Sequence, residues 1–351
     1  MVTLGPSGDV GNPDGLIPEE LGFMCGIEIH QQLSSGKLHS RQEGILYELN
    51  LEEIPDDWNR VRRKQRAARG EAGKIDTAAA FEQKRNRSFI YVQTPNSGLI
   101  ELDEAPPLPL DPKALETTLR ISAMLNATPA PHLQVMRKTV VDGSNTSGFQ
   151  RTTLVATGGK FEVEGTEVGI SVICLEEDSA RKLGEETNSG GQEVTYSLDR
   201  LGIPLVEIAT DPDITSPEHA EAVSRYLGGR LRDTRSVRRG LGSIRQDLNV
   251  SIACGDRVEI KGCQDLEWIP RIIRIEMARQ LHFFRLANEL RVEQGYAPLL
   301  DDRRLDDKED EAKIRTLVEK ILRGGVVDVT EALGGIETKM IASAIRSDHG
   351  I

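Results

Sequence analysis

The sequence is poor in aromatic residues and cysteines and contains no long apolar run. Phe, Trp and Tyr make up only 4% of its 351 residues, so we expect a core built mainly from Leu, Ile, Val and Ala. No run of about 18 apolar residues is present, and the N-terminus lacks a basic stretch followed by an apolar one. These absences argue against a membrane span and a secretory signal, and they predict a cytoplasmic protein with no membrane partner.

The cysteines are too few and too widely spaced to form a recognisable framework. None of them forms a Cys-x-x-Cys pair, which argues against a disulfide scaffold and a cysteine zinc site. We predict buried thiols in a reducing compartment at Cys25, Cys174, Cys254 and Cys263.

Acidic residues outnumber basic ones, and this excess has two interpretations. The chain carries 56 Asp and Glu against 44 Lys and Arg, for a net charge of −12, and Arg greatly outnumbers Lys. A protein that works in concentrated salt and an ordinary acidic cytosolic protein would both show this balance. An RNA partner is compatible with it, because local charge patches decide contact.

Composition divides the chain into four parts. Residues 1–16 are rich in Gly, Pro and Asp and are expected to form a disordered tail. The main domain is predicted over 17–265, followed by a long helix that packs on it over 266–300. Residues 301–351 are predicted to form a charged connector and a small segment in which the sequence shows no recognisable domain end.

The pattern of apolar residues predicts a mixed α/β (α+β) fold. We expect helices over 57–87, 112–126, 217–231 and 268–293, with Asp111 and Ser216 as the N-caps of the second and third. Seven core positions at helical spacing are predicted in the last helix: Ile269, Ile272, Ile273, Met277, Leu281, Phe284 and Leu290. Period-two alternation predicts strands over 22–33, 136–142, 152–156, 160–164, 168–175, 203–209, 243–253 and 257–261.

Two basic segments stand out, and neither is specific by itself. Six of the ten residues over 60–69 and five of the ten over 230–239 are basic. A solvated helix face and a phosphate-contacting surface would both look like the first segment. The second ends in RRGLGS, where small residues beside arginines suit phosphate binding.

Acidic residues within apolar runs form the strongest chemical signal. Three separate segments each bring carboxylates into an apolar setting, where a charge is costly unless it is paired or bound to a cation. Oxygen ligands from three segments predict one shared site for a hard metal ion. The residues concerned are Glu28 and His30, Glu176, Glu177 and Asp178, and Glu207.

A predicted hairpin carries a second polar group. Over 243–253 and 257–261, alternation places apolar residues on one face and polar residues on the other. An ordinary half-exposed sheet would show the same alternation. The chemical mix favours a functional surface, because cations suited to phosphate lie beside oxygen ligands suited to a metal: Arg245, Asp247, Asn249, Glu259 and Lys261.

Seven ordered blocks of the chain resemble the GatB/GatE family of tRNA-dependent amidotransferases, and within it the archaeal-type GatE branch. The blocks are GIEIHQQL (26–33), LIELDEAPP (99–107), DGSNTSGFQRT (142–152), LEED (175–178), DRLGIPLVEIATDPDI (199–214), SIRQDLNVSI (243–252) and RVEIKG (257–262).

The resemblance implies a cradle-shaped catalytic domain with a mixed or antiparallel sheet, followed by a helical extension. It implies a carbon–nitrogen ligase, with ATP and Mg²⁺ as cofactors and glutamine as amide donor. ATP phosphorylates the side-chain carboxylate of glutamate esterified to tRNA(Gln), and ammonia from an asparaginase-like partner protein, the D subunit of the amidotransferase, displaces the phosphate. The partners it implies are therefore this D subunit, in a heterodimer, and glutamyl-tRNA(Gln).

The two polar groups and the chemistry that the resemblance implies together predict roles for individual residues. We expect catalytic roles for Glu28, Arg245, Asp247 and Lys261. Nucleotide binding is expected at Arg200, Ser243, Arg245, Asn249 and Glu259. A metal site is expected at His30, Glu177 and Glu207, with Glu176 as a further ligand and Glu28 and Asp199 close by. Because neighbouring strand residues point to opposite faces, at least one of Glu176 and Glu177 should lie outside the first coordination shell.

Two departures from the family pattern shape further expectations. Members often carry a Cys-x-Cys zinc site after the first strand, whereas this chain has KLHSRQ over 37–42, so we expect no zinc there. Proteins of the GatE branch continue beyond the point matched by Ile351, so a fragment or truncated form is expected. Such a chain should bind ATP with metal but need further regions and the D subunit to form glutaminyl-tRNA. A catalytically incomplete tRNA- or subunit-binding module and a phosphotransferase acting on a free carboxylate are the alternatives.

Overall fold

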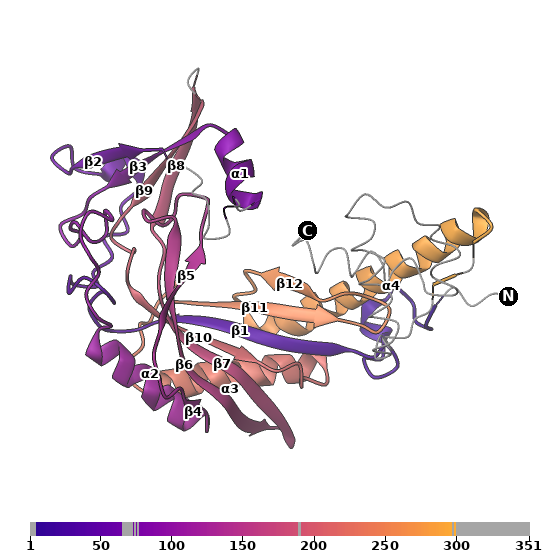
Figure 1. Cartoon of the computed structure of the whole chain (residues 1–351). Helices are drawn as coiled ribbons and strands as arrows, with labels where there is room; N and C mark the ends of the chain where they lie inside the picture. The colour runs from indigo at the N-terminus through magenta and orange to yellow at the C-terminus, as the bar shows by residue number, and fades with distance from the viewer. Residues whose placement is uncertain are drawn as a thin grey trace.

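Two β-sheets set at an angle form the frame of the protein (Figure 1). The computed structural model describes residues 5–64, 73, 75, 77–188, 191–296 and 298–299. The larger sheet has the strand order β12-β11-β1-β10-β7-β6-β4, with β5 also paired to β6. Its strands are β12 (Val258–Lys261), β11 (Ile244–Ser251), β1 (Met24–Gln32), β10 (Pro204–Thr210), β7 (Thr166–Glu177), β6 (Phe149–Val163), β4 (Thr128–Pro129) and β5 (Val135–Thr139).

The smaller sheet stands at one end of the larger one (Figure 1). Its order is β2-β3-β9-β8, and the β3–β9 pair is parallel whereas the pairs in the larger sheet are antiparallel. The mixed fold predicted from sequence, with mostly antiparallel strands, is therefore confirmed. The strands of this sheet are β2 (Arg60–Arg63), β3 (Arg87–Val92), β9 (Gly191–Ser197) and β8 (Arg181–Asn188).

Helices cover one face of the larger sheet and leave the other open. α2 packs on β6 and β7, α3 on β1 and β6, and α4 on β11 and α3. Alternation in β1 explains the two faces, because Ile27 and Ile29 are fully buried under the helices while Glu28 and His30 are only half-buried on the opposite side. The helices are α1 (Thr77–Lys84), α2 (Pro112–Met124), α3 (Pro217–Asp233) and α4 (Ile269–Glu293).

Both predicted helix caps are present. The Asp111 side chain accepts a hydrogen bond from the Ala114 amide at 2.8 Å, and the Ser216 hydroxyl accepts one from the His219 amide at 3.1 Å. Each satisfies an amide that has no partner within the first turn of its helix. The starts of α2 and α3 are therefore fixed by local sequence.

The predicted helix over 57–87 is wrong in its first part. Residues 60–63 form strand β2, which pairs with β3, and only 77–84 are helical. Pairing with a neighbouring strand outweighs the helix propensity of Arg and Lys, which is small for each residue. The remaining basic residues of the predicted surface, over 65–69, lie outside the described residues.

The strands expected over 152–156 and 160–164 form one long strand, β6. The gap expected between them holds Gly158 and Gly159, and the second of these glycines allows close packing within the strand. A Cβ atom at Gly159 would lie 2.7 Å from the Leu125 carbonyl oxygen, so glycine allows the end of α2 to approach the strand. Strands β3, β8 and β9 were not predicted, and together with β2 they make up the whole smaller sheet.

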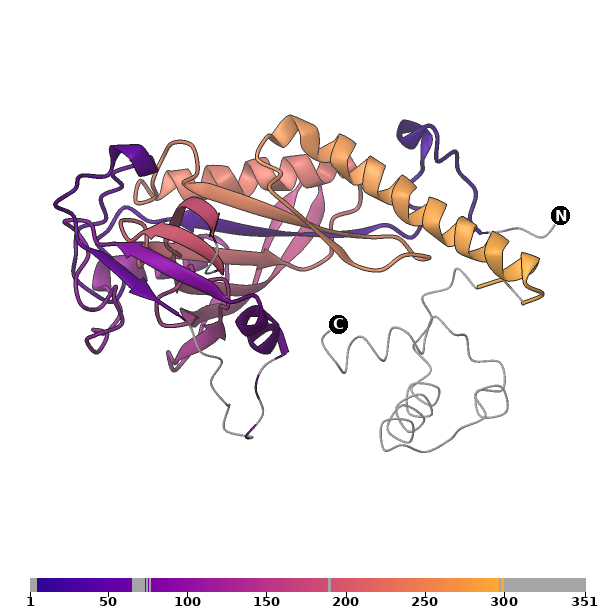
Figure 2. The ribbon, with the colours of Figure 1, turned by 90° about the horizontal axis from the view of Figure 1, so that it is seen from above.

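The N-terminal segment differs from the expected disordered tail. Over 5–16 it packs along α4, with Leu16 buried and the Arg285 side chain donating a hydrogen bond to the Gly8 carbonyl at 2.8 Å. The C-terminal part of α4, near the N-terminal segment, extends past the strands (Figure 2). Its predicted core positions are buried or partly buried apart from Leu290, which is 54% exposed because the sheet does not reach that turn. The connector and small segment predicted over 301–351 lie outside the described residues.

Among the described residues, none of the helices combines the length and apolar character that a membrane crossing needs.

The packing of α4 on the sheet can be tested with two isoleucines of the same helix. Ile273 is fully buried, whereas Ile275 is 50% exposed. Replacing Ile273 by Ala should lower the free energy of unfolding by about 2–5 kcal/mol, because it leaves a cavity. The matched Ile275→Ala variant should change it by under about 0.5 kcal/mol. Denaturant titration measures both, and equal losses would contradict this packing.

Candidate active site

A polar cavity opens on the face of the larger sheet that the helices leave free. Its volume is about 610 Å³, and strands β1, β5, β6, β7, β11 and β12 contribute side chains to it. Its lining consists of Glu28, His30, Lys138, Gln150, Glu176, Ser179, Arg245, Asp247, Glu259, Lys261, Gly262 and Gln264.

Strand register brings three of the predicted residues together, and two of them, His30 and Glu176, line this cavity. His30 on β1 lies opposite Glu207 on β10, and the next strand, β7, supplies Glu176. The His30 Nε2 atom lies 3.5 Å from a Glu207 oxygen, 3.7 Å from a Glu176 oxygen and 3.5 Å from a Glu28 oxygen. We call His30, Glu176 and Glu207 the carboxylate–histidine cluster.

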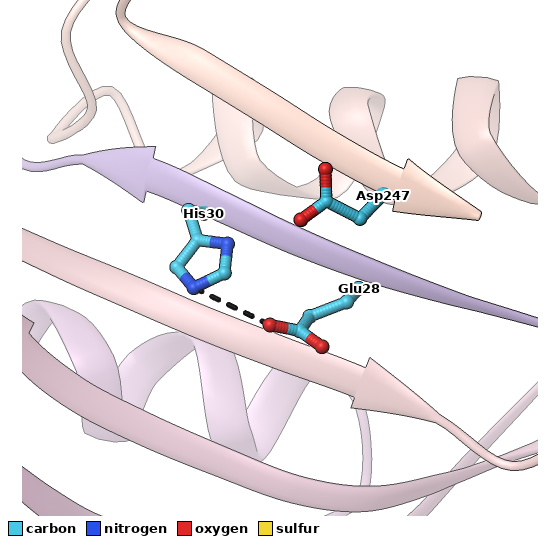
Figure 3. Close-up of side chains that lie close together, drawn as sticks. All are labelled: Glu28, His30 and Asp247. Atoms are coloured by element: carbon cyan, nitrogen blue, oxygen red, sulfur yellow. Dashed lines mark ion pairs between the residues drawn. The ribbon is translucent and has the colours of Figure 1, made fainter. Parts of the chain in front are cut away.

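Two groups of side chains here have the spacing of metal ligands, and they share His30. In the cluster, one ligand atom from each residue lies within 4.8 Å of the others, and the same holds for Glu28, His30 and Asp247. Figure 3 shows this second group, in which Glu28 approaches the imidazole from β1 and Asp247 approaches from the neighbouring β11.

The donor set of the cluster fits a divalent cation. Carboxylate oxygens are the ligands preferred by Mg²⁺ and Mn²⁺, and imidazole nitrogen suits several transition metals. Glu176 is 1% exposed, and its side chain accepts hydrogen bonds from the Thr152 hydroxyl at 2.8 Å and the Gln150 amide at 3.1 Å. Such bonds hold a ligating carboxylate in place.

Without a cation, the crowding of charge shifts the pKa values in this cluster. Burial, followed by the charge of Glu207, raises the pKa of Glu176 to about 7. The pKa of His30 is raised, because its bond to Glu207 and three nearby carboxylates outweigh the opposing effect of burial. The pKa of Glu207 is lowered, since hydrogen bonds from His30 and from protonated Glu176 outweigh its burial. The pKa of Glu28 is raised by burial and then by Glu207.

Basic side chains flank the carboxylates on the β11–β12 side. Lys261 lies 2.9 Å from an Asp247 oxygen and 2.6 Å from a Glu259 oxygen, and these contacts raise the pKa of Lys261 against the effect of its partial burial. Arg245 lies 3.2 Å from an oxygen of the buried Asp178. The hairpin therefore presents fixed cations beside the cluster, as its alternation predicts.

Glu177 is not part of the cluster. It points to the opposite side of β7 and lies 3.0 Å from Arg151, so its charge is already paired. The expectation that Glu177 joins His30 and Glu207 is wrong in this respect, and Glu176 takes that place. Asp199, expected close by, instead accepts hydrogen bonds from Ser197 and from the Tyr47 and Arg200 amides.

Three residues predicted to bind nucleotide lie outside the cavity lining. Arg200 donates to the carbonyls of Ser179 and Ala180, so it holds the turn after β7 in place. Ser243 lies at the start of β11, beside a different cavity. Asn249 lies two residues beyond Asp247 along β11, farther from the cluster.

Sequence reasoning assigned no role to several residues that the fold places in the site. Lys138 lies 3.9 Å from Glu176, and Gln150 and Thr152 bond to the same carboxylate. Gln150 and Thr152 belong to the quoted block DGSNTSGFQRT, and their alternation along one strand was the available signal. Lys138 carried no signal, because only the β5–β6 pairing brings it to the cluster.

Comparison with known proteins decides the family. The sequence profile of the GatB/GatE catalytic domain matches residues 23–320. The chain belongs to the GatB/GatE catalytic domain family. Every element that contributes to the cavity lies within the matched range.

Three similar curated relatives are each named as the E subunit of glutamyl-tRNA(Gln) amidotransferase. The protein of Thermococcus gammatolerans is 45% identical over 334 residues, which cover 95% of this chain and 48% of the relative. That of Pyrococcus furiosus is 48% identical over 282 residues, covering 80% and 43%. That of Methanosarcina acetivorans is 48% identical over 272 residues, covering 77% and 42%. The chain thus spans somewhat less than half the length of these relatives.

Metal binding by the cluster can be tested with two glutamates of the same strand. Glu176→Gln should weaken the binding of Mn²⁺ by at least about tenfold, because one charged oxygen ligand is lost. Glu167→Gln, at an exposed position of β7 paired with Lys160, should bind Mn²⁺ as the unchanged protein does. Titration calorimetry measures both, and equal affinities for all three proteins would refute the ligand role of Glu176.

The raised pKa of Glu176 predicts how stability depends on pH in the absence of metal. The folded protein holds this proton more tightly than the unfolded chain does, so its contribution to stability is complete at low pH. That contribution is lost as the pH rises from about 4.5 to about 7. Relative to the unchanged protein, Glu176→Gln should therefore gain stability across this range. Unfolding titrations at several pH values measure the difference, and a difference that stays constant would contradict the assignment.

Proposed function

We propose that this chain supplies the ATP-dependent catalytic cradle of a glutamyl-tRNA(Gln) amidotransferase, working in the cytoplasm with ATP and Mg²⁺. The observation that carries the proposal is one cavity lined by His30 and Glu176 of the carboxylate–histidine cluster together with the Arg245 and Lys261 cations. Family membership and the names of the relatives support the same reaction.

The proposed reaction has two steps. A γ-phosphoryl group passes from ATP to a side-chain carboxylate oxygen of the esterified glutamate, so a new P–O bond forms and ADP leaves. Ammonia then attacks the acyl carbon, phosphate leaves, and a proton is released as the amide forms. Phosphoryl transfer depends on positioning and charge stabilisation and needs no protein nucleophile.

Different residues of the proposed site would position the cation and the transferring phosphoryl group. The cluster and Glu28 would hold a divalent cation, which when bound offsets the negative charge of the triphosphate. Arg245 and Lys261 present fixed positive charge toward the transferring group. Asp247 and Asp178 fix those two cations through ion pairs of 2.9 and 3.2 Å.

The ammonia is proposed to come from an asparaginase-like partner protein that serves as the D subunit of the amidotransferase. Burial raises the pKa of Cys25 and of Cys174 to about 12 in each case, so neither thiol forms a reactive thiolate at neutral pH. Cys263 is shifted in the same direction. An amide-hydrolysing nucleophile on a separate chain would supply the second substrate.

The role of Arg245 in this proposal predicts a loss of rate. In the complete complex, Arg245→Ala should lower the rate of ATP-dependent glutaminyl-tRNA formation by about 100- to 1,000-fold, as removal of other preorganised donors does. Arg257→Ala removes an exposed arginine outside the cavity and should leave the rate unchanged. Amino acids released from the tRNA are separated by chromatography to measure the product. An Arg245 variant as fast as the Arg257 control would contradict the proposed function.

A further inference from the structure

The second half of α4 carries apolar side chains on both its inner and its outer side. Leu281 and Phe284 are 0% and 5% exposed and belong to the core. On the outer side, Phe283, Leu286 and Leu290 are 55%, 38% and 54% exposed. A helix at the surface of a protein normally turns polar residues outward, and a helix that is apolar all round is usually buried. We call Phe283, Leu286 and Leu290 the outer stripe.

The outer stripe is continuous along the helix. Its members are three and four positions apart, so they lie on one side of α4 over two turns, a length of about 10 Å. At this end α4 extends past the strands (Figure 2), so the larger sheet does not cover the stripe. We propose that residues 311–323 of this same chain cover it.

The sequence of this segment suits that role. Residues 311–323 read EAKIRTLVEKILR and lie outside the described part of the chain. Five apolar residues recur at helical spacing, with charged and polar residues between them: Ile314, Leu317, Val318, Ile321 and Leu322. If helical, the apolar side from 314 to 322 would be about 12 Å long, close to the length of the outer stripe.

The path of the chain after α4 leads back toward the stripe. The helix ends at Glu293, and Gly295, with a φ of 79°, turns the chain. The Leu299 amide then donates a hydrogen bond to the Asn288 side chain at 2.6 Å, and that side chain donates to the Leu299 carbonyl at 3.4 Å. Residue 299 is therefore held level with the outer stripe. The next eleven residues can span up to about 36 Å, so residues 311–323 can reach it.

The family match supports an occupant from the same chain. The profile of the GatB/GatE catalytic domain extends to residue 320, so it includes Ile314, Leu317 and Val318 as well as α4. Residues of one domain share its hydrophobic core. A segment joined to α4 by a short connection also has a high effective concentration at the stripe, which a separate chain lacks.

This contact is independent of the proposed function. The outer stripe lies on a helix that covers the sheet face opposite the polar cavity, so its cover contributes nothing to the cluster. Docking of the segment would instead fix the direction in which the chain after residue 323 leaves the catalytic domain.

Thiol labelling in the full chain tests whether the stripe is covered. The four native cysteines are buried, so a cysteine introduced by Leu286→Cys would be the main reactive thiol. If the segment covers the stripe, a maleimide reagent should label this thiol at least about tenfold more slowly than the thiol of Glu167→Cys, because only the undocked fraction reacts. Glu167 is 65% exposed and lies on β7, far from α4 in sequence.

Substitutions within the segment identify the occupant. Added to Leu286→Cys, Ile321→Asp places a charge on the apolar side and should speed labelling by at least about tenfold. Leu317→Ala, a milder change, should speed it by a smaller factor. Thr316→Asp adds the same charge on the polar side and should leave the rate unchanged. The labelling rate of Glu167→Cys with Ile321→Asp, which should not change, controls for loss of the fold.

Three results would overturn the proposal. Leu286→Cys labelled as fast as Glu167→Cys would show that the stripe is open. Protection that disappears on dilution would assign the stripe to a second copy of the chain. Protection that survives both dilution and Ile321→Asp would show that other residues cover it. Protection that is independent of concentration and is lost with Ile321→Asp but not with Thr316→Asp is the result we expect.

Discussion

The site depends on the register of four adjacent antiparallel strands. Pairing of β7, β10, β1 and β11 places a histidine of one strand among carboxylates of the others, on the face that the helices do not cover. Buried carboxylates at this spacing repel one another, so without a cation burial and the charge of Glu207 raise the pKa of Glu176, and the surrounding carboxylates raise the pKa of His30 against the effect of its burial. A divalent cation resolves the same conflict, which links the stability of the sheet to its proposed chemistry.

Much of the larger sheet follows from the sequence. Alternation in β1 separates Ile27 and Ile29 from Glu28 and His30, and the β11–β12 hairpin has the two faces that its pattern predicts. These predictions succeed because one face of each strand is buried and the other is polar. A shift of the strand pairing by one residue would turn the apolar side chains to the polar face and the polar side chains into the core. Helix starts such as that of α2 are also predictable, because the Asp111 cap bonds to an amide only three residues along the chain.

Other features depend on contacts between distant segments, and sequence patterns did not show them. Glu176 and Glu177 are neighbours in sequence with the same chemistry, and only the register of β7 in the sheet decides which one faces His30 and Glu207, while the other pairs with Arg151. The smaller sheet was missed because its strands join through tertiary pairing, with β3 parallel to β9. Arg200 was predicted to contact a ligand, yet the backbone carbonyls of Ser179 and Ala180, in the turn after β7, bond to its guanidinium.

One divalent cation shared by His30, Glu176 and Glu207 is the central feature of the proposed site. Crystals grown with Mn²⁺ and AMP-PNP would test it through anomalous scattering at the manganese absorption edge. We expect a single strong peak about 2.0–2.6 Å from oxygens of Glu176 and Glu207, with nucleotide phosphate bound to the same ion. A fully occupied nucleotide with no peak at the cluster, or with its metal held by other residues, would contradict it.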